Sequence, residues 1–213
     1  MTSPPPDSAA GFTDERLPRT PRAVALVLHG GAEFAEDPVD GRSLSWHRGR
    51  RLLRDIARPL DRAGVGIALL RYRVKGWNAG PGVPPPVVDA RWALDELEER
   101  HGLPVVIVGH SMGGRTAAAV ADHPAVRGVV TLAPWLPPGE PVAPLTDKIL
   151  RAAHGRLDRI TSAPATRAYV ERAARVCDAE FTDMGDAGHY LLRRMRAWNQ
   201  FAVDAVRDVI DRD

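Results

Sequence analysis

The sequence has little cysteine, little lysine and no long apolar run. Its single cysteine, Cys177, excludes an intrachain disulfide and any metal site built from several thiolates. No stretch approaches the roughly 18 consecutive apolar residues that a membrane-spanning helix needs. The first residues (MTSPPPDSAAGF) also lack the basic and apolar regions of a signal peptide. These absences predict a cytoplasmic protein without a membrane partner.

The chain of 213 residues also lacks an excess of charge of either sign. It carries 29 lysines and arginines against 27 acidic residues, and all but two of the basic residues are arginine. Proteins that bind nucleic acid gather an excess of positive charge on one face, where it neutralises phosphates. The balance therefore predicts that the protein has no nucleic-acid partner.

What the chain does contain is a regular alternation of apolar runs and helical patterns. Apolar runs typical of buried strands occupy 23–28, 65–70, 105–108 and 126–132, with weaker candidates at 148–153 and 179–182. Apolar residues at helical spacing occupy 43–62, 85–100, 112–122, 163–175 and 190–210. Strands that alternate with helices predict an α/β fold with a mostly parallel central sheet and helices on both faces.

The pattern predicts one folded domain after an N-terminal tail. Residues 1–21 are rich in proline, serine and charge, which is typical of a flexible tail, with a short edge strand as the alternative. Residues 22–213 show neither an internal repeat nor a linker, so we expect them to form a single domain.

The most informative segment is Gly109–Gly113 (GHSMG), which has the form G-x-S-x-G. An apolar run precedes it and an alanine-rich helical pattern follows, and this context indicates a nucleophilic serine. A serine at such a tight turn is exposed above the sheet, and the N-terminus of the next helix favours an oxyanion beside it. We therefore predict that Ser111 is the nucleophile, with a plain glycine-rich turn as the alternative.

A second glycine-rich stretch, 29–32 (HGGA), follows the first predicted strand. In hydrolases with a serine at such a turn, a backbone N–H from this loop and the N–H after the nucleophile form the oxyanion hole. We expect Met112 to supply one donor and either Gly31 or Ala32 to supply the other. His29 is expected to be structural.

A general base is expected after the serine in the chain. Three histidines follow Ser111, namely His123, His154 and His189. His123 lies in a pattern typical of a surface turn, and His154 lies just before the candidate acid. His189 lies in a glycine-rich loop immediately before the last predicted helix, from which it can reach over the sheet edge. We predict that His189 is the base, a surface-loop histidine being the alternative.

The acid is predicted to be Asp158, which follows the weak strand at 148–153. The stretches from Ser111 to Asp158 and from Asp158 to His189 are each long enough for one strand and one helix. The expected role of Asp158 is to hydrogen-bond the base and fix its tautomer. Asp183 and Asp186 are alternatives, but they crowd His189 in sequence. Asp147, at the start of the preceding strand, is a weaker alternative.

Taken together, these stretches resemble the α/β-hydrolase superfamily. The matching segments are 29–32 (HGGA), 109–114 (GHSMGG), 154–161 (HGRLDRIT) and 185–192 (GDAGHYLL), and they occur in the family's order over roughly residues 20–210. The resemblance implies a single-domain α/β-hydrolase fold with Ser111, Asp158 and His189 as a catalytic triad. The GHSMGG form is similar to that of monoacylglycerol-lipase-like and dienelactone-hydrolase-like serine hydrolases, and of type II thioesterases.

The chain departs from family members that carry a large lid. Only residues 134–146, a short proline-rich stretch, are available to cover the site, so we expect a minimal cap and an open, lidless site. Trp77, Asn78 and Trp135 lie on loops at the predicted carboxyl edge of the sheet, where ligands bind in open α/β folds. They are weaker predictions for substrate contacts, and a packing role is the alternative for each.

The predicted function is cleavage of a carboxylic ester by a serine hydrolase through an acyl-enzyme. Its expected partner is a small-molecule ester or thioester. A thioesterase acting on acyl-thioesters is the first alternative, and a non-catalytic ligand-binding protein with the same fold is the second. The sequence predicts no cofactor and no metal. Any histidine or acidic pair at ligand spacing is better explained by the hydrolase pattern, and Gly109–Gly114 has no phosphate-loop lysine.

Overall fold

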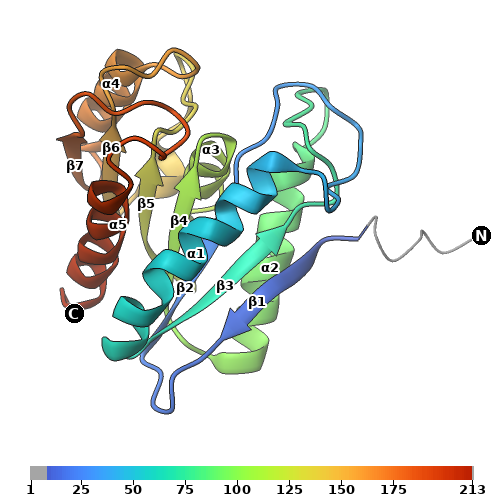
Figure 1. Cartoon of the computed structure of the whole chain (residues 1–213), viewed down its shortest axis with the longest axis vertical. Helices are drawn as coiled ribbons and strands as arrows, with labels where there is room; N and C mark the ends of the chain where they lie inside the picture. Colours follow the sequence, from blue (N-terminus) through green and yellow to red (C-terminus); the bar gives the residue numbers. More distant parts are fainter. Residues whose placement is uncertain (1–8, 213) are drawn as a thin grey trace, which may run out of the picture.

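A seven-stranded sheet forms the centre of the protein in a computed structural model, which describes residues 9–212 (Figure 1). The strands are β1 (Gly11–Arg16), β2 (Ala23–Leu28), β3 (Val65–Arg71), β4 (Val105–His110), β5 (Val126–Leu132), β6 (Ile149–His154) and β7 (Asp178–Asp183). They lie in the order β1-β3-β2-β4-β5-β6-β7. All neighbours are parallel except β1, which runs antiparallel to β3. The predicted α/β class and mostly parallel sheet are thus confirmed.

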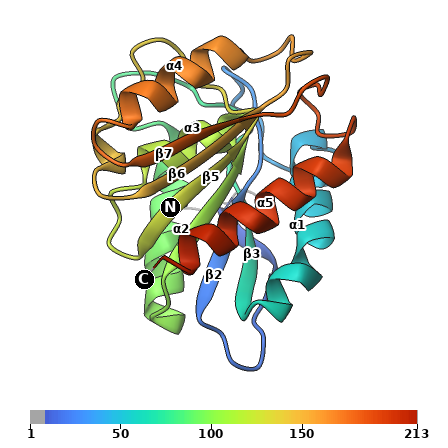
Figure 2. The ribbon, with the colours of Figure 1, turned by 90° about the vertical axis from the view of Figure 1, so that its left-hand side faces the viewer.

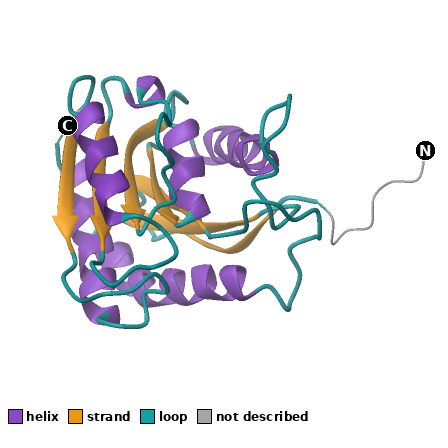
Figure 3. Ribbon diagram, turned by 90° about the horizontal axis from the view of Figure 1, so that it is seen from above, coloured by secondary structure: helices purple, strands orange, loops and turns teal. Residues whose placement is uncertain are grey.

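Helices cover both faces of this sheet (Figure 3). The helices are α1 (Leu44–Arg62), α2 (Pro85–His101), α3 (Met112–Ala119), α4 (Ala163–Ala173) and α5 (Met195–Ile210), with a short 3₁₀ turn η2 (Ala143–Leu145). Helices α1 and α5 lie side by side on one face (Figure 2), and α2, α3 and α4 lie on the other. None of the helices within residues 9–212 is long and apolar enough to cross a membrane.

The central strands are apolar on both sides because the two faces bury separate cores. Side chains alternate along a strand, so Leu26 of β2 packs with α2 and α3, whereas its neighbour Val27 packs with α1 and α5. Every residue of β2 and β4 is buried. A strand covered on both faces has a continuous run of apolar residues, which is the pattern seen in the sequence.

The N-terminal segment contains the short edge strand that was the alternative to the predicted flexible tail. Within residues 1–21, Gly11–Arg16 forms β1 at the edge of the sheet, so the ordered domain begins before residue 22. The ring of Phe12 in this strand packs 5.5 Å from that of Trp92, and the guanidinium of Arg100 lies over it. Residues 1–8 of the predicted tail lie outside the described part of the chain.

The last helix begins five residues later than its apolar spacing predicts, at Met195 instead of residue 190. Leu191 and Arg194 have positive φ angles of 60° and 59°, which interrupt a right-handed helix. The segment before α5 is therefore a loop, and it carries His189 over the end of the sheet.

The parallel arrangement brings the predicted functional segments to one edge of the sheet. His29 follows the carboxyl end of β2, Ser111 follows β4, and Asp158 follows β6. Since β2, β4, β5 and β6 are parallel neighbours, these ends meet at the same edge. In open α/β sheets this is the edge where ligands bind.

Candidate active site

Ser111 lies at a sharp turn between β4 and α3. Its φ and ψ angles of 56° and −119° are rarely adopted by residues with a side chain and cost about 1–3 kcal/mol. A Cβ on Gly109 would overlap the backbone of Gly113, and one on Gly113 would overlap the carbonyl of Leu28. The flanking glycines therefore allow the close packing that holds the serine at the apex of the turn.

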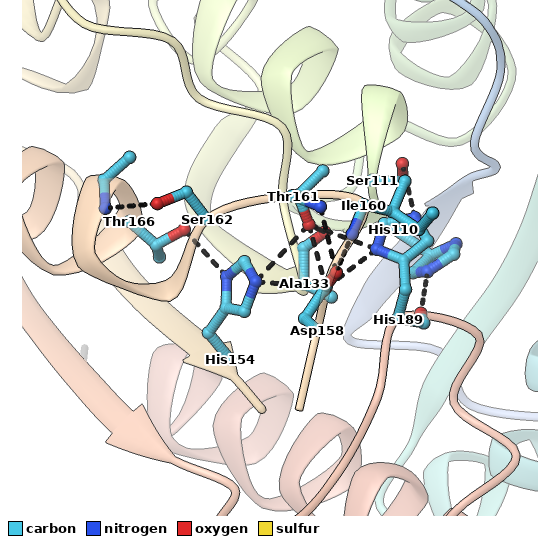
Figure 4. A network of polar contacts seen from close by, with 11 residues as sticks. His110, Ser111, Ala133, His154, Asp158, Ile160, Thr161, Ser162, Thr166 and His189 are labelled. Atoms are coloured by element: carbon cyan, nitrogen blue, oxygen red, sulfur yellow. Dashed lines mark hydrogen bonds and ion pairs between the residues drawn. The ribbon is translucent and has the colours of Figure 1, made fainter. Parts of the chain in front are cut away.

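The structure brings Ser111, His189 and Asp158 into one chain of hydrogen bonds (Figure 4). The Ser111 Oγ lies 3.0 Å from His189 Nε2, and His189 Nδ1 lies 2.8 Å from Asp158 Oδ2. Because a carboxylate only accepts hydrogen bonds, Nδ1 carries the proton and Nε2 accepts from the serine hydroxyl. This is the orientation that a general base needs.

Two of the alternatives, His123 and Asp183, lie in other contacts. The Nε2 of His123 lies 3.0 Å from a carboxylate oxygen of Asp95. Asp183 accepts from the guanidinium of Arg156 at 2.8 Å and from the backbone N–H of Gly185. His123 thus contacts α2, and Asp183 contacts Arg156 and its own loop.

The side chain of Asp158 is buried and surrounded by donors. Its Oδ1 accepts from the backbone N–H groups of Ile160 (2.8 Å) and Thr161 (2.9 Å). Its Oδ2 accepts from His189, from the Thr161 hydroxyl (2.9 Å) and from His154 Nε2 (3.1 Å). Burial alone would raise the pKa of Asp158, but these hydrogen bonds outweigh it and hold the pKa well below the usual range. The carboxyl group is therefore ionised at neutral pH.

His154 and Thr161 are functional neighbours that sequence reasoning missed. His154 is fully buried at the end of β6, and its Nδ1 lies 2.9 Å from the hydroxyl of Thr166, so both ring nitrogens are engaged. Asp158 thus lies between two imidazoles, as Figure 4 shows. In the sequence His154 is a rival base, and only its position four residues before the acid hinted at a contact with that acid.

Two further buried histidines lie at this edge of the sheet, and one of them holds a loop of the site. His110 Nε2 donates to the carbonyl of His189 at 2.8 Å, and the centres of the two rings lie 5.0 Å apart. Burial, with the nearby His189, lowers the pKa of His110 to about 3, and burial lowers that of His29 to about 4. Both rings are therefore neutral near pH 7, and His110 ties the loop of the candidate base to the serine turn.

The glycine-rich loop after β2 packs against the serine turn. A Cβ on Gly30 would lie 3.2 Å from that of Ser111, and one on Gly31 would overlap the side chain of Met112. The backbone N–H of Ala32 already donates to the carbonyl of Lys75 at 2.9 Å. Of the two predicted donors in this loop, Gly31 is the one whose N–H is not taken up in that contact.

The three predicted substrate contacts lie in protein contacts near this edge. The guanidinium of Arg115 lies over the rings of Trp77 (4.1 Å) and Trp135 (4.6 Å), and it pairs with Glu140 at 2.8 Å. These contacts anchor the cover loop, residues 134–146, to α3. The side chain of Asn78 bonds both backbone groups of residue 35. A role of these three residues in substrate contact stays a prediction.

Comparison with known proteins shows the family of this chain. Residues 25–212 match the Alpha/beta hydrolase family. The chain belongs to this family. The predicted resemblance to α/β hydrolases is confirmed. No curated protein matches the sequence.

Solved structures with this α/β-hydrolase fold are similar over nearly the whole chain. A serine hydrolase without a lid from Xanthomonas campestris has a TM-score of 0.67 at 18% identity, and the match covers 96% of this chain and 95% of that one. Est1E from Butyrivibrio proteoclasticus has a TM-score of 0.68 at 12% identity, with 95% and 94% covered. A thermophilic esterase from Thermogutta terrifontis has a TM-score of 0.68 at 17% identity, with 95% and 88% covered. At such low identity the likeness shows the fold.

Proposed function

We propose that this α/β hydrolase cleaves small carboxylic esters through an acyl-enzyme formed on Ser111. The observation that supports this most directly is the continuous hydrogen-bond chain from the Ser111 hydroxyl through His189 to the ionised Asp158. The chain joins three loops that are far apart in sequence, and packing alone does not require it.

In the acylation step, His189 Nε2 accepts the hydroxyl proton while the Ser111 Oγ attacks the carbonyl carbon of the ester. The backbone N–H groups of Met112 and Gly31 donate to the oxyanion of the tetrahedral intermediate. When the intermediate collapses, the carbon–oxygen bond to the alcohol breaks, and His189 gives its proton to the departing alcohol.

In the deacylation step, a water molecule loses its proton to His189 Nε2 and attacks the acyl carbon. Collapse of the second intermediate breaks the bond to the Ser111 Oγ, which takes the proton back, and the carboxylic acid leaves. Asp158 stays ionised throughout and stabilises the positively charged imidazole of His189.

The choice of ester substrates is supported by two structural neighbours. The Thermogutta terrifontis esterase was solved with butyrate, and Est1E was also solved with ferulic acid. Acyl-thioesters are the natural comparison, because the same three residues would cleave them and release a thiol.

The test compares wild-type protein with Ser111→Ala and with Ser45→Ala, a control on α1. Reaction with a fluorophosphonate and hydrolysis of p-nitrophenyl acetate, p-nitrophenyl butyrate and butyryl-coenzyme A are measured. We expect Ser111→Ala to lose labelling and about 10⁴-fold or more of the ester turnover, and Ser45→Ala to retain both. Unchanged turnover in Ser111→Ala refutes the assignment. A wild-type protein that neither reacts with the fluorophosphonate nor turns over favours the ligand-binding alternative.

A further inference from the structure

A groove of about 540 Å³ opens beside Asp158, between two loops at the carboxyl edge of the sheet. One wall is the beginning of the cover loop, residues 135–138, and is made of tryptophan, leucine and two prolines. The other wall is the acid loop, residues 156 and 158–165. The groove is mainly apolar along the cover loop and carries arginines on the acid loop.

Both walls of the groove contact residues of the candidate triad. The backbone N–H of Trp135 donates to the carbonyl of Ser111 at 3.0 Å. On the opposite wall, the Thr161 hydroxyl lies 3.1 Å from His189 Nδ1. The groove therefore borders the candidate triad, next to the place where a substrate ester would react with Ser111.

The acid loop presents its outer side chains from a rigid backbone. The two backbone hydrogen bonds to Asp158 Oδ1 fix the turn that contains Arg159 and Ile160. Arg159 is exposed, and Ile160 is 61% exposed although it is a large apolar residue. Because the backbone is already ordered, contact with a ligand here loses less conformational entropy than contact with a mobile loop.

The charge in the groove is uncompensated at one position. Arg156 forms an ion pair with Asp183 at 2.8 Å, and Asp158 is buried behind its own donors. Arg159 has no ion-pair or hydrogen-bond partner for its guanidinium among residues 9–212. An exposed isoleucine next to an unpaired guanidinium complements a ligand that has an apolar body and an anionic end.

We propose that this groove binds one arm of the ester substrate, an apolar group that ends in a carboxylate or another anion, and that Arg159 pairs with that anion. The inference rests on the proposed hydrolysis at Ser111 and specifies its substrate class. A guanidinium–carboxylate pair supplies charge-assisted hydrogen bonds and favours the charged substrate over a neutral one of the same length. Ile160 and Trp135 contact the apolar part.

The experiment uses two matched substrate pairs. Mono-p-nitrophenyl glutarate and p-nitrophenyl valerate differ by an anionic end on the acyl arm, and 4-acetoxybenzoate and phenyl acetate differ by one on the alcohol arm. The ratio of kcat/KM for the charged ester to that for the neutral ester is measured for wild-type protein and for Arg159→Gln, Arg159→Lys and Arg62→Gln. Arg62, the last residue of α1, lies near the opposite edge of the sheet and is the control.

For one of the two substrate pairs, we expect Arg159→Gln to lower the charged-to-neutral ratio of kcat/KM by about 5- to 10-fold. This is the size expected for loss of a partly exposed charge-assisted hydrogen bond. Turnover of the neutral esters should change less than about twofold. Arg159→Lys should restore part of the preference, and Arg62→Gln should leave it unchanged. The pair that responds identifies the arm in the groove.

A ratio that Arg159→Gln leaves unchanged in both pairs overturns the inference while the hydrolase proposal stands. Failure of the wild-type protein to hydrolyse even the neutral esters overturns the hydrolase proposal itself, and the inference falls with it.

Discussion

The position of Asp158 between two imidazoles makes Asp158→Asn an informative substitution. The change replaces one acceptor oxygen by an NH₂ group and leaves the size of the side chain unchanged. In the wild type, all five contacts to this carboxylate come from donors, two at Oδ1 and three at Oδ2. An amide placed there must therefore direct its NH₂ group at donors in either orientation.

The two orientations of the amide differ in cost. With its NH₂ group at the Oδ1 position, the amide faces the backbone N–H groups of Ile160 and Thr161, which have no other protonation state. With its NH₂ group at the Oδ2 position, it faces His189 and His154, whose rings can move their proton to the other nitrogen. Two unsatisfied buried donors cost about 1–3 kcal/mol each, so the second orientation is preferred.

In that orientation His189 must accept at Nδ1 and carry its proton at Nε2, so it can no longer accept the proton of Ser111. We expect kcat to fall by about 10⁴-fold, the loss known when the acid of a Ser-His-Asp triad is replaced by its amide. This fall corresponds to about 5 kcal/mol of activation free energy. The free energy of unfolding should change much less, because the backbone contacts of the turn are retained.

The assay combines p-nitrophenyl butyrate hydrolysis with urea denaturation of wild-type protein, Asp158→Asn and Asp183→Asn. Asp183 is also an aspartate of the carboxyl edge, but it is paired with Arg156, so its amide variant should keep activity within about threefold. An Asp158→Asn variant that is folded and retains more than a tenth of the wild-type kcat would refute the tautomer argument. A large loss of stability with Asp158→Asn would show that the amide turns toward the backbone.

Three further predictions concern stability. Burial holds the pKa values of His29 and His110 near 4 and 3, below the 6.5 of an unfolded histidine, so the unfolded chain binds more protons than the folded one at acidic pH. As the pH is lowered from 6.5, the free energy of unfolding, measured by urea titration, should therefore decrease by about 2–3 kcal/mol per pH unit. Gly113→Ala should lower the free energy of unfolding by about 3 kcal/mol, because the added Cβ overlaps the backbone. Gly41→Ala, whose Cβ meets nothing within 4 Å, should change the free energy of unfolding by less than about 0.5 kcal/mol. Glu140→Ala should lower the free energy of unfolding by about 2 kcal/mol, because it leaves the guanidinium of Arg115 on α3 without its carboxylate partner. It should also speed proteolysis of the cover loop.

Each of these three has a clear contrary result. A free energy of unfolding that is flat between pH 4.5 and 6.5 would contradict the neutral state of the buried rings. Equal stability of the two alanine variants would contradict the close packing at the serine turn. Unchanged proteolysis of the Glu140 variant would show that the aromatic contacts of Arg115 anchor the cover loop without the ion pair.

The buried strands and the order of the motifs are visible in the sequence for physical reasons. A strand covered on both faces, such as Val105–His110, has to be apolar along most of its length, and this shows in a single sequence. The serine turn constrains its neighbours to glycine, so Gly109 and Gly113 mark the position of Ser111. The candidate base and acid follow from their loops and chain order.

Features that depend on tertiary contacts are not visible in this way. The strand Gly11–Arg16 has one large apolar residue and is only partly buried, so it resembles a tail. The start of α5 depends on two left-handed residues, and local spacing does not reveal them. The contact of His154 with Asp158 arises because β6 and the acid loop fold back on each other. Thr161 is positioned by the same turn.

The backbone conformation of Ser111 sets stability against the proposed activity. With φ at 56° and ψ at −119°, the residue occupies a conformation that glycine adopts readily and serine does not. A glycine at this position would relieve the strain and so make the inactive protein more stable than the active one, by about 1 kcal/mol. Selection for thermostability alone would therefore favour loss of the proposed nucleophile, and only a screen that also demands turnover would retain it.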